Sequence, residues 1–382
     1  AIDPPADPVT PPAEVPVEVP AEAIDPPADP VTPPAEVPVE VPAEAIDPPA
    51  DPVTPPAEVP VDVPVEAIDP PAESDDSQTD PVSQPVVAAY YPEWGIYGRD
   101  YQIADVPGED LTHFIYAFAN LTANGDMVLF DSYAATEKRF SAEESVSGEA
   151  DLWSYPADDP RSQQTVWGNF NQLAQLKAKY PHLRTSIALG GWTLSGNFSS
   201  VCSTAQGRET LANSIYSFLD TYSVFDGIDF DWEYPGGGGL SSNGVSSEDG
   251  ANYELLLGLV REKLDQLGGE TGRYYEITVA SPAGYDKVAN FNLEGLKQHV
   301  DFFNVMTYDF HGTWENTTGH QAALTNDPNG YDIATAIDIY LDAGVEREQI
   351  VLGAPAYTRA WSGVADGGDN GYDEATSGAA PG

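Results

Sequence analysis

Short apolar runs alternate with amphipathic stretches along the chain from residue 85 onward. The runs are rich in β-branched and aromatic residues, which is typical of buried strands, whereas the amphipathic stretches show the apolar spacing of helices. Seven strands are predicted, at 86–91, 112–119, 183–189, 225–231, 275–281, 301–307 and 349–354. Helices are predicted near 165–179, 207–222, 250–267, 293–299 and 332–343. This alternation predicts an α/β fold, a (β/α)8 TIM barrel that is incomplete at its C-terminus, with strands 1–7 present.

Residues 1–84 follow a different pattern. A 22-residue unit, AIDPPADPVTPPAEVPVEVPAE, occurs three times with small changes, and a fourth copy breaks off near Ala72. Each full unit has seven prolines, five acids and no aromatic residue, so it can form neither a packed core nor a helix. The pattern predicts a disordered, extended linker that ends near residue 84. It is interpreted either as a spacer in front of the folded domain at 85–382 or as a repeat that expanded without a function.

The charge of the chain excludes several classes of partner. There are 62 Asp and Glu against 15 Lys and Arg, and residues 1–84 contain no basic residue at all. Such a chain repels nucleic acids and anionic lipids, so no nucleic-acid or membrane partner is expected. No apolar run is long enough to cross a bilayer. The acidity of 85–382 has two interpretations, a secreted protein of a saline habitat or a general acidity without such a meaning.

The segment FDGIDFDWEYP at 225–235 contains the strongest candidate chemistry. Asp229, Asp231 and Glu233 alternate with apolar residues, so in a strand all three side chains lie on one face, about 6–7 Å apart. A proline and four glycines follow Glu233 and end the strand. Catalytic residues of TIM barrels lie at the C-terminal ends of the strands, which favours a catalytic role over a solvated acidic edge.

No metal site or cofactor is expected from the remaining residues. The single cysteine, Cys202, excludes an intramolecular disulfide bond, and the glycines at 236–239 lack the Lys of a phosphate-binding loop. The five histidines are scattered without the spacing of metal ligands, at His113, His182, His299, His311 and His320.

Several motifs together show a resemblance to a known family. The segment 225–235 reads as a DxxDxDxE signature, formed by Asp226, Asp229, Asp231 and Glu233. Four further motifs occur in the expected order: YYPEWGIYGRDY at 90–101, LGGWTLSGNF at 189–198, VMTYDFHGTW at 305–314 and LGAPAYTRAW at 352–361. With them, residues 85–382 resemble glycoside hydrolase family 18, in particular its bacterial chitinase A type. The resemblance implies a secreted, extracellular and monomeric chitinase that acts on chitin and N-acetylglucosamine oligosaccharides.

The resemblance also implies a mechanism, in which the 2-acetamido oxygen of the substrate attacks the anomeric carbon. Glu233 is then the general acid, and Asp231 and partial burial are expected to raise its pKa. Asp231 orients the acetamide N–H, Asp229 shares a proton with Asp231, and Tyr308 donates to the acetamide carbonyl. Asp226 has the opposite strand parity and is expected to fix the start of the strand.

Eight further residues are expected to bind the sugar chain. Trp94 is placed at the glycone end, Trp192 and Trp314 on the aglycone side, and Tyr90 beneath the reacting sugar. Met306 either lines the floor or only fills the barrel. The full set of substrate-binding residues is Tyr90, Trp94, Trp192, Met306, Asp309, Trp314, Tyr357 and Arg359. The other tryptophans are expected to be packing residues, namely Trp153, Trp167, Trp232 and Trp361.

Two departures from the family pattern stand out. Residues 362–382 resemble the start of a small inserted α+β domain, and no segment matches that whole domain or the eighth strand, so the chain is expected to be a fragment of a longer enzyme. Many members have Ser where this chain has Ala188, and Ser186 is expected to supply part of the lost hydrogen bonding.

Two alternative functions remain open at this point. An endo-β-N-acetylglucosaminidase that acts on glycoprotein glycans would use the same acids, and a chitin-binding lectin would use the same fold without catalysis. Lectins of this kind typically lose the acid, whereas Glu233 is present.

Overall fold

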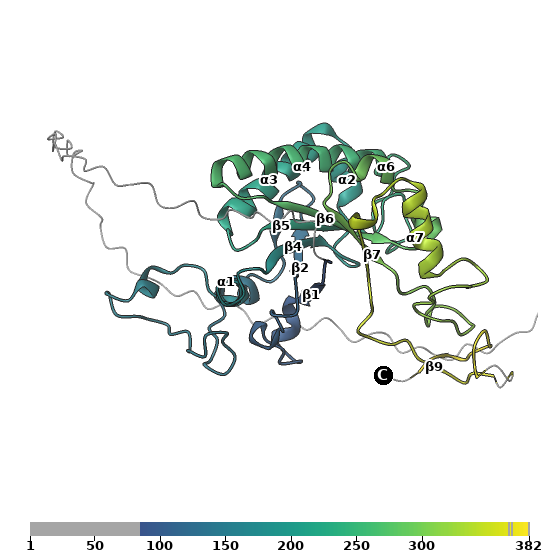
Figure 1. Cartoon of the computed structure of the whole chain (residues 1–382), viewed down its shortest axis with the longest axis horizontal. Helices are drawn as coiled ribbons and strands as arrows, with labels where there is room; N and C mark the ends of the chain where they lie inside the picture. The colour runs from purple at the N-terminus through teal and green to yellow at the C-terminus, as the bar shows by residue number, and fades with distance from the viewer. Residues whose placement is uncertain (1–84, 366, 368–369, 381–382) are drawn as a thin grey trace, which may run out of the picture. The chain divides into compact units, whose positions relative to one another are not determined.

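The computed structural model describes residues 85–365, 367 and 370–380; the predicted linker at 1–84 lies outside this part. Its centre is a parallel sheet of seven strands (Figure 1). In spatial order these are β1 (Ala88–Pro92), β2 (His113–Leu121), β4 (Arg184–Gly190), β5 (Gly227–Asp231), β6 (Glu276–Pro282), β7 (Phe302–Met306) and β8 (Ile350–Leu352). A short strand, β3 (Met127–Leu129), runs antiparallel to β2.

The sheet is curled into a half-barrel, and all seven predicted strands are confirmed. Each of the seven follows its neighbour in sequence order with parallel pairing, which is the connectivity of a TIM barrel. Strands β1 and β8 form the two edges, and within the described ranges no strand joins them. The prediction of an incomplete barrel is therefore confirmed.

Helices cover the outer face of the sheet (Figure 1). They are α1 (Gly168–Lys179), α2 (Phe198–Cys202), α3 (Ala205–Thr221), α4 (Asp249–Thr271), α5 (Tyr285–Val288), α6 (Leu293–Leu296) and α7 (Ile333–Asp342). The predicted helix at 293–299 is shorter than expected, since only α6 is helical and Lys297 begins a turn. Gly295 lowers the helix propensity of this segment. None of the helices in the described part has the length and apolarity needed to cross a membrane.

Short helical turns lie in the connections. They are η2 (Glu93–Ile96), η3 (Ile103–Asp105), η4 (Tyr133–Glu137), η5 (Pro160–Gln163) and η6 (Arg347–Gln349). Near the end of the described chain, β9 (Trp361–Ser362) pairs antiparallel with β10 (Gly378–Ala379). The Thr318 hydroxyl donates to the carbonyl of Gly371 (2.5 Å), which ties this segment to the loop after β7. Whether 362–382 begins an inserted domain stays a prediction.

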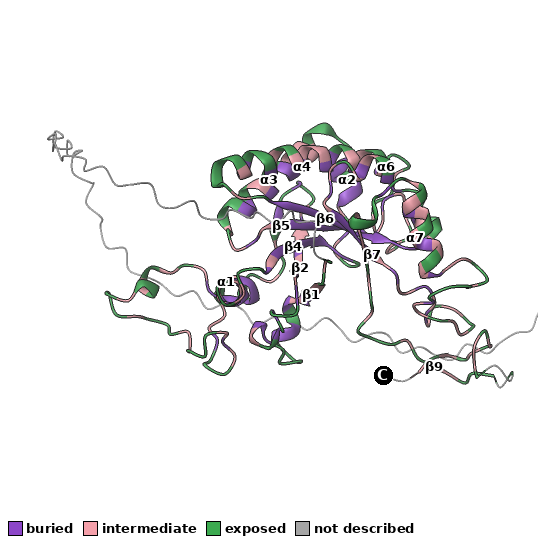
Figure 2. Ribbon diagram, in the orientation of Figure 1, coloured by how far each residue is buried: buried purple, intermediate pink, exposed green. Residues whose placement is uncertain are grey.

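The hydrophobic core lies between the sheet and its helices (Figure 2). On β5 and just after it, Ile228, Phe230 and Trp232 are buried on the outer face. The Trp232 ring stacks on Phe198 of α2 and meets Tyr253 of α4 edge-on, with 5.2 Å between centroids in both pairs. Because residues of one parity are fixed under these helices, the alternate residues of β5 must face the inside of the half-barrel.

Asp226 holds the start of β5, as its parity indicated. Its carboxylate accepts hydrogen bonds from Lys177 (2.5 Å), from Arg273 (2.6 Å) and from the backbone N–H of Thr185 (2.9 Å). All three partners lie at the amino end of the sheet, so Asp226 orients the strand and does not face the inside of the half-barrel.

Candidate active site

Three carboxylates line the carboxyl end of β5 on the inner face. Asp229 is fully buried, and Asp231 and Glu233 are 6% and 8% exposed. Ionised carboxyl groups are rarely buried without partners, because desolvation disfavours the charged form. The hydrogen bonds and pKa shift of each carboxyl group therefore indicate whether the protein stabilises its ionised or its protonated form.

Asp229 is held by three donors from other strands. It accepts hydrogen bonds from the hydroxyl of Tyr90 on β1 (2.8 Å), from Thr278 on β6 (2.5 Å) and from Asn304 on β7 (3.1 Å). Burial raises the pKa of Asp229, and these three hydrogen bonds oppose the rise.

Two sequence-based expectations concern the hydrogen bonds of Asp229. Within the described residues no hydrogen bond joins Asp229 to Asp231, and the sharing of a proton between them stays a prediction; the donors to Asp229 are Tyr90, Thr278 and Asn304. Ser186 is buried, but it is not among those donors, and Thr278 and Asn304 supply the hydrogen bonds instead.

The sequence reasoning missed Thr278 and Asn304. Both are buried polar residues within strands, and Thr278 is the register partner of Asp229. A buried polar residue on a strand of the same sheet as the candidate acids was the signal that could have found them.

Glu233 is positioned through its backbone. Its N–H donates to the Ser195 hydroxyl (2.9 Å), which in turn donates to the carbonyls of Gly191 (2.9 Å) and Asp231 (3.1 Å). The Asn243 amide donates to the Glu233 carbonyl (3.0 Å). Ser195 and Asn243 could not be recognised from the sequence, because they lie in loops with many other polar residues.

The electrostatics keep a proton in this site near neutral pH. Burial raises the pKa of Glu233 to about 7, opposed by a hydrogen bond from Tyr234 and supported by the charge of Asp309. Burial, with the charges of Glu233 and Asp229, raises the pKa of Asp231 well above its ordinary value. The two acids interact, since the charge of Glu233 raises the pKa of Asp231. The charge that raises the pKa of Glu233 is that of Asp309, which the sequence did not suggest, and not that of Asp231. Glu233 and Asp231 titrate as one pair.

Asp231 also has an unused acceptor. Its Oδ1 is buried and finds no hydrogen-bond partner among the described residues. Leaving a buried acceptor unsatisfied costs about 1–3 kcal/mol. A bound group with an N–H at this position would remove that cost.

The loop after β7 and the segment after β8 form a second polar cluster. Asp309 accepts from the Tyr357 hydroxyl (2.7 Å) and from both Nε (2.9 Å) and Nη2 (2.7 Å) of Arg359. Tyr308 meets Tyr357 edge-on at 6.2 Å, and burial and the charge of Asp231 raise its pKa. Asp309 is thus engaged by protein donors, whereas the sequence suggested a free contact to sugar or water.

The predicted binding aromatics are exposed at the strand ends. Trp94, Trp192 and Trp314 are 46%, 47% and 59% exposed. The Trp94 ring stacks on Phe118 at 6.1 Å, and the Arg359 guanidinium lies 5.2 Å from the Trp314 ring. Met306, the last residue of β7, is half-buried, so both of its interpretations remain open.

One expectation about tryptophan packing is wrong. Trp153 is 81% exposed, in the long connection between β3 and α1, with Arg139 over its ring at 5.4 Å. Trp167 and Trp232 are buried as expected, and Trp361 is half-buried. Trp153 lies in an irregular segment, and no helix or strand of the described part covers its ring.

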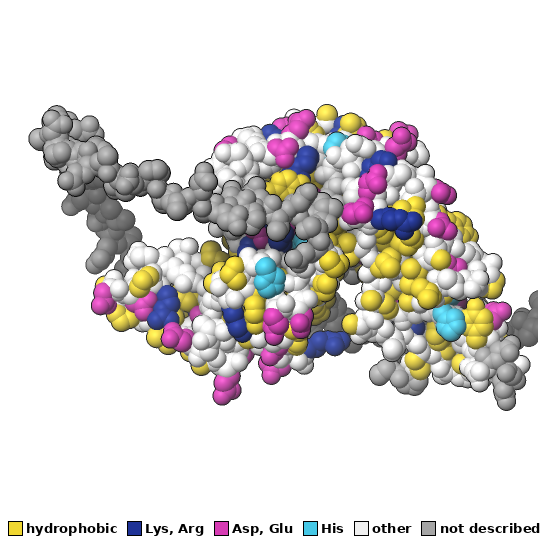
Figure 3. All heavy atoms as spheres, in the orientation of Figure 1, with side chains coloured by type: hydrophobic (Ala, Val, Ile, Leu, Met, Phe, Trp, Pro, Cys, Tyr) yellow, Lys and Arg dark blue, Asp and Glu magenta, His cyan; other side chains and the backbone are white. Residues whose placement is uncertain are grey.

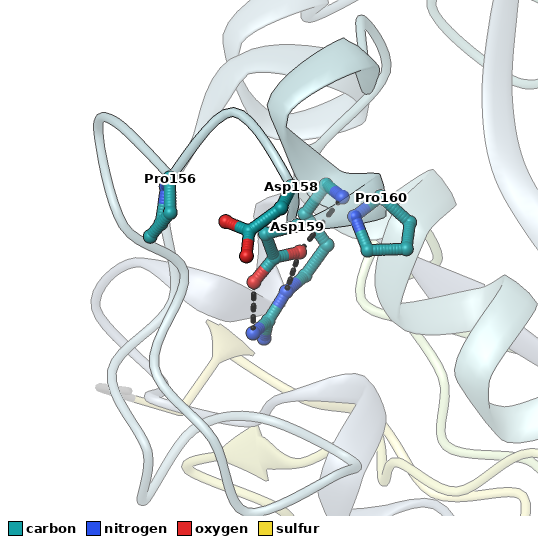
Figure 4. A pocket seen from close by; sticks show the side chains of 5 residues that line it. Pro156, Asp158, Asp159 and Pro160 are labelled. Atoms are coloured by element: carbon teal, nitrogen blue, oxygen red, sulfur yellow. Dashed lines mark hydrogen bonds and ion pairs between the residues drawn. The ribbon is translucent and has the colours of Figure 1, made fainter.

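The same connection contains a shallow hollow unrelated to the acids (Figure 4). Arg161 donates to Asp159 there through Nε (3.1 Å) and Nη2 (2.9 Å). None of the predicted site residues lines this hollow. The residues that line it are Pro156, Asp158, Asp159, Pro160 and Arg161. In the described ranges, no cluster of three or more His, Cys, Asp or Glu side chains is arranged to hold a metal ion.

A curled parallel sheet with buried acids at the end of one strand, and with exposed tryptophans in loops that follow other strands, is typical of a barrel-type glycoside hydrolase. Comparison with protein families agrees. The model of the glycosyl hydrolases family 18 matches residues 86–380, and the chain belongs to this family.

Curated relatives carry the name chitinase. The chain is 38% identical over 336 residues to chitinase A1 of Niallia circulans, covering 78% of this chain and 46% of that protein. It is 34% identical over 328 residues to chitinase A of Pseudoalteromonas piscicida, covering 74% of this chain and 38% of that protein. The chain thus spans less than half the length of these two relatives.

Solved structures confirm the fold. The catalytic domain of the psychrophilic chitinase B from Arthrobacter TAD20 matches with a TM-score of 0.69 and 32% identity, covering 77% of this chain and 76% of that one. Chitinase ChiA74 from Bacillus thuringiensis matches with a TM-score of 0.66 and 35% identity, covering 75% of this chain and 50% of that one.

Proposed function

We propose that this protein is a chitinase that hydrolyses β-1,4 links between N-acetylglucosamine units with retention of the anomeric configuration. The relatives named chitinase support the substrate class. The observation that carries the mechanism is the buried Oδ1 of Asp231, which has no hydrogen-bond partner in the described part of the chain, beside a glutamate whose pKa is raised to about 7. Because chitin is an insoluble polymer, we also propose that the enzyme acts outside the cell.

In the first step Glu233 protonates the glycosidic oxygen while the acetamide oxygen of the same sugar attacks C1. The leaving sugar takes the proton, and a cyclic oxazolinium ion forms in place of a covalent enzyme ester. Asp231 accepts the acetamide N–H through its free oxygen and stabilises the positive charge. Tyr308 donates its hydroxyl to the acetamide oxygen and holds it near C1.

In the second step a water molecule attacks C1 as Glu233, now a carboxylate, removes its proton. The oxazolinium ring opens and the acetamide group is restored. The product keeps the anomeric configuration of the substrate because two successive displacements take place at C1. Glu233 therefore needs a pKa close to the working pH, so that it can donate in one step and accept in the next.

The aromatic rings support binding of a polymer. Sugars present apolar C–H faces that stack on aromatic rings, and Trp94, Trp192 and Trp314 are all exposed at strand ends. The Tyr90 hydroxyl donates a hydrogen bond to Asp229, which supports the proposal that its ring lies beneath the reacting sugar. Met306, Asp309, Tyr357 and Arg359 complete the proposed substrate contacts.

The first test replaces Glu233 with Gln in the full-length protein. Turnover of soluble chitin oligomers should fall by about 100-fold or more, the usual contribution of general acid–base catalysis. The dissociation constant for the same oligomers should change by less than about threefold, since the amide keeps the shape of the carboxyl group. Glu262→Gln, an exposed position on α4, is the matched control and should keep full turnover.

Other outcomes would point to the alternatives. If the unmutated full-length protein binds chitin oligomers and cleaves none, the protein is a lectin. If it releases glycans from a high-mannose glycoprotein and leaves chitin oligomers intact, it is an endo-β-N-acetylglucosaminidase.

A further inference from the structure

His311 lies in the loop between β7 and α7, clamped between two carboxylates. Its Nδ1 is 3.0 Å from Oε2 of Glu315, and its Nε2 is 3.0 Å from Oδ2 of Asp327. The side chain of His311 is 13% exposed and that of Asp327 is 2% exposed. An ionised carboxylate can only accept, so when Glu315 and Asp327 are both ionised this geometry favours donation by both ring nitrogens, that is, an imidazolium.

The carboxylates of this clamp are themselves fixed by the backbone. Asp327 accepts from the N–H groups of Asn329 (2.8 Å) and Tyr331 (3.2 Å). The N–H of Asp327 donates to Asp332 (3.1 Å), the residue that caps the first turn of α7. His311 therefore connects the loop after β7 to the start of α7.

The other half of the clamp lies directly beside Trp314. Glu315 also accepts from the N–H of Gly312 (3.2 Å), which closes a short turn that contains Trp314. The indole ring lies against the Cα of Gly312, since a Cβ there would come within 2.1 Å of the ring. The position of Trp314 therefore follows the position of the turn 311–315.

We propose that His311 is a positioning residue: held as an imidazolium between Glu315 and Asp327, it fixes the turn that presents Trp314 to the sugars on the aglycone side. This inference rests on the proposed function, because it assigns His311 to the binding of the same substrate. Arg359 supports Trp314 from another segment, with its guanidinium 5.2 Å from the ring.

The environment of His311 maintains its charge. Burial lowers its pKa, but the hydrogen bonds and charges of Asp327 and Glu315 outweigh burial, so that the pKa is raised above its ordinary value. The edge of Tyr331 lies 6.3 Å away, and Tyr331 stacks on Tyr285 of α5 at 5.2 Å. Asp286 of α5 also interacts with Tyr331, and it is paired with Lys287 (3.0 Å). The positive charge of Lys287 is thus balanced by Asp286, and the carboxylates that contact His311 directly are Glu315 and Asp327.

The sign of the pH effect follows from the raised pKa. The clamp is complete below the ordinary pKa of histidine, about 6.5, and is lost as the pH rises through the raised value. The neutral ring can donate to one carboxylate only, and its other nitrogen then repels the second. Affinity for oligomers that reach the aglycone side should weaken over that range.

The test is a double-mutant cycle on binding. In the full-length Glu233→Gln background, which removes turnover and the titration of Glu233, the dissociation constant of a chitin hexamer is measured. His311→Gln and Trp314→Ala should each raise this dissociation constant about five- to tenfold. The double variant should bind the hexamer as tightly as Trp314→Ala alone, because the effects of residues that act as a unit do not add. Additive effects, or no effect of His311→Gln, overturn the inference.

A second measurement needs neither a ligand nor a variant of His311. The five histidines of the chain are titrated by NMR in the unmutated protein. One imidazole should titrate clearly above 6.5, and the indole N–H signal of Trp314 should shift with the same midpoint. The inference is overturned if His311 titrates at or below 6.5, or if the Trp314 signal does not respond.

A control separates this inference from the proposed function. His299, which lies beside Gly258 of α4, is replaced with Gln and should leave the dissociation constant unchanged. If Trp314→Ala weakens binding and His311→Gln does not, only the role of His311 fails. If Trp314→Ala also has no effect, the aglycone subsite fails with it.

Discussion

The active-site acids differ in how far the protein satisfies them. Asp229 has three hydrogen-bond donors, whereas the Oδ1 of Asp231 has none in the described part of the chain. An acid that is satisfied by the protein stays fixed, and one that is not is available to a substrate. This difference between neighbouring carboxyl groups supports the proposed division of roles, in which Asp229 is structural and Asp231 meets the acetamide.

Tyr90→Phe tests the role of the fixed aspartate. The change removes one of three donors to buried Asp229, and loss of a hydrogen bond to a charged group should lower the free energy of unfolding by about 1–2 kcal/mol. Urea unfolding at pH 7 measures it. Tyr133→Phe, at an exposed tyrosine, is the control and should change stability very little. Equal stability of both variants would contradict the account.

Asp309→Asn tests the electrostatics of Glu233. The acid works while protonated, so kcat/KM should fall as the pH rises through its pKa of about 7. The charge of Asp309 supports that raised pKa, and its removal should move the alkaline limb to lower pH. Asp265→Asn, on the exposed side of α4, should leave the limb in place. If the alkaline limb of kcat/KM in Asp309→Asn stays at the same pH or moves to higher pH, the assigned effect of Asp309 on Glu233 is wrong.

At the residue scale, the sequence was most informative where spacing determines direction. The alternation of Asp229, Asp231 and Glu233 was enough to place them on one face. Thr278 and Asn304 were missed because their role depends on how β6 and β7 are arranged relative to β5, which the sequence of a single strand does not reveal. Trp153 was misassigned because a lone tryptophan does not show whether a helix will cover it.

At the scale of elements, the close contact between the ends of β4 and β5 positions the acids of the candidate site. At Gly190 the backbone has a φ of +110°, and a Cβ would lie 2.3 Å from the carbonyl oxygen of Asp231. Glycine adopts such a φ without strain, and no other residue fits beside the partner strand. The glycine at the end of β4 thus allows the backbone of Asp231 to lie close against it.

Gly190→Ala should therefore unfold or strongly destabilise the protein, by about 3 kcal/mol or more for combined strain and overlap. Gly269→Ala is the matched control, because Gly269 is an exposed residue of α4 with open space around its Cα. It should stabilise by up to about 1 kcal/mol, the difference in helix propensity. Denaturant unfolding of both variants measures the contrast, and similar effects of the two changes would contradict this account.

The longer elements were predictable because their apolar pattern extends over several turns or a full strand. Helices α1, α3, α4 and α7 begin and end within a few residues of their predicted limits. The short elements α2, α5 and β3 were not predicted. Elements of this length have too few positions for a periodic pattern, and neighbouring strands and helices determine their formation.

At the scale of the whole molecule, acidic side chains dominate the charge. Residues 85–382 contain 42 acids and 15 bases, and on the face in Figure 3 the acidic side chains are scattered over the surface. Repulsion among them opposes the compact state and is screened by salt. The melting temperature should therefore rise by a few degrees between about 0.05 and 1 M NaCl. A fall over this range would show that specific ion pairs outweigh the general repulsion.

The central claim is that the acetamide of the substrate attacks its own ring while Glu233 supplies the proton. The most direct test is proton NMR of the first products from a chitin hexamer, recorded before mutarotation. The account predicts that the new reducing ends appear as the β-anomer and convert to the α-anomer afterwards. New reducing ends that appear first as the α-anomer would contradict the mechanism.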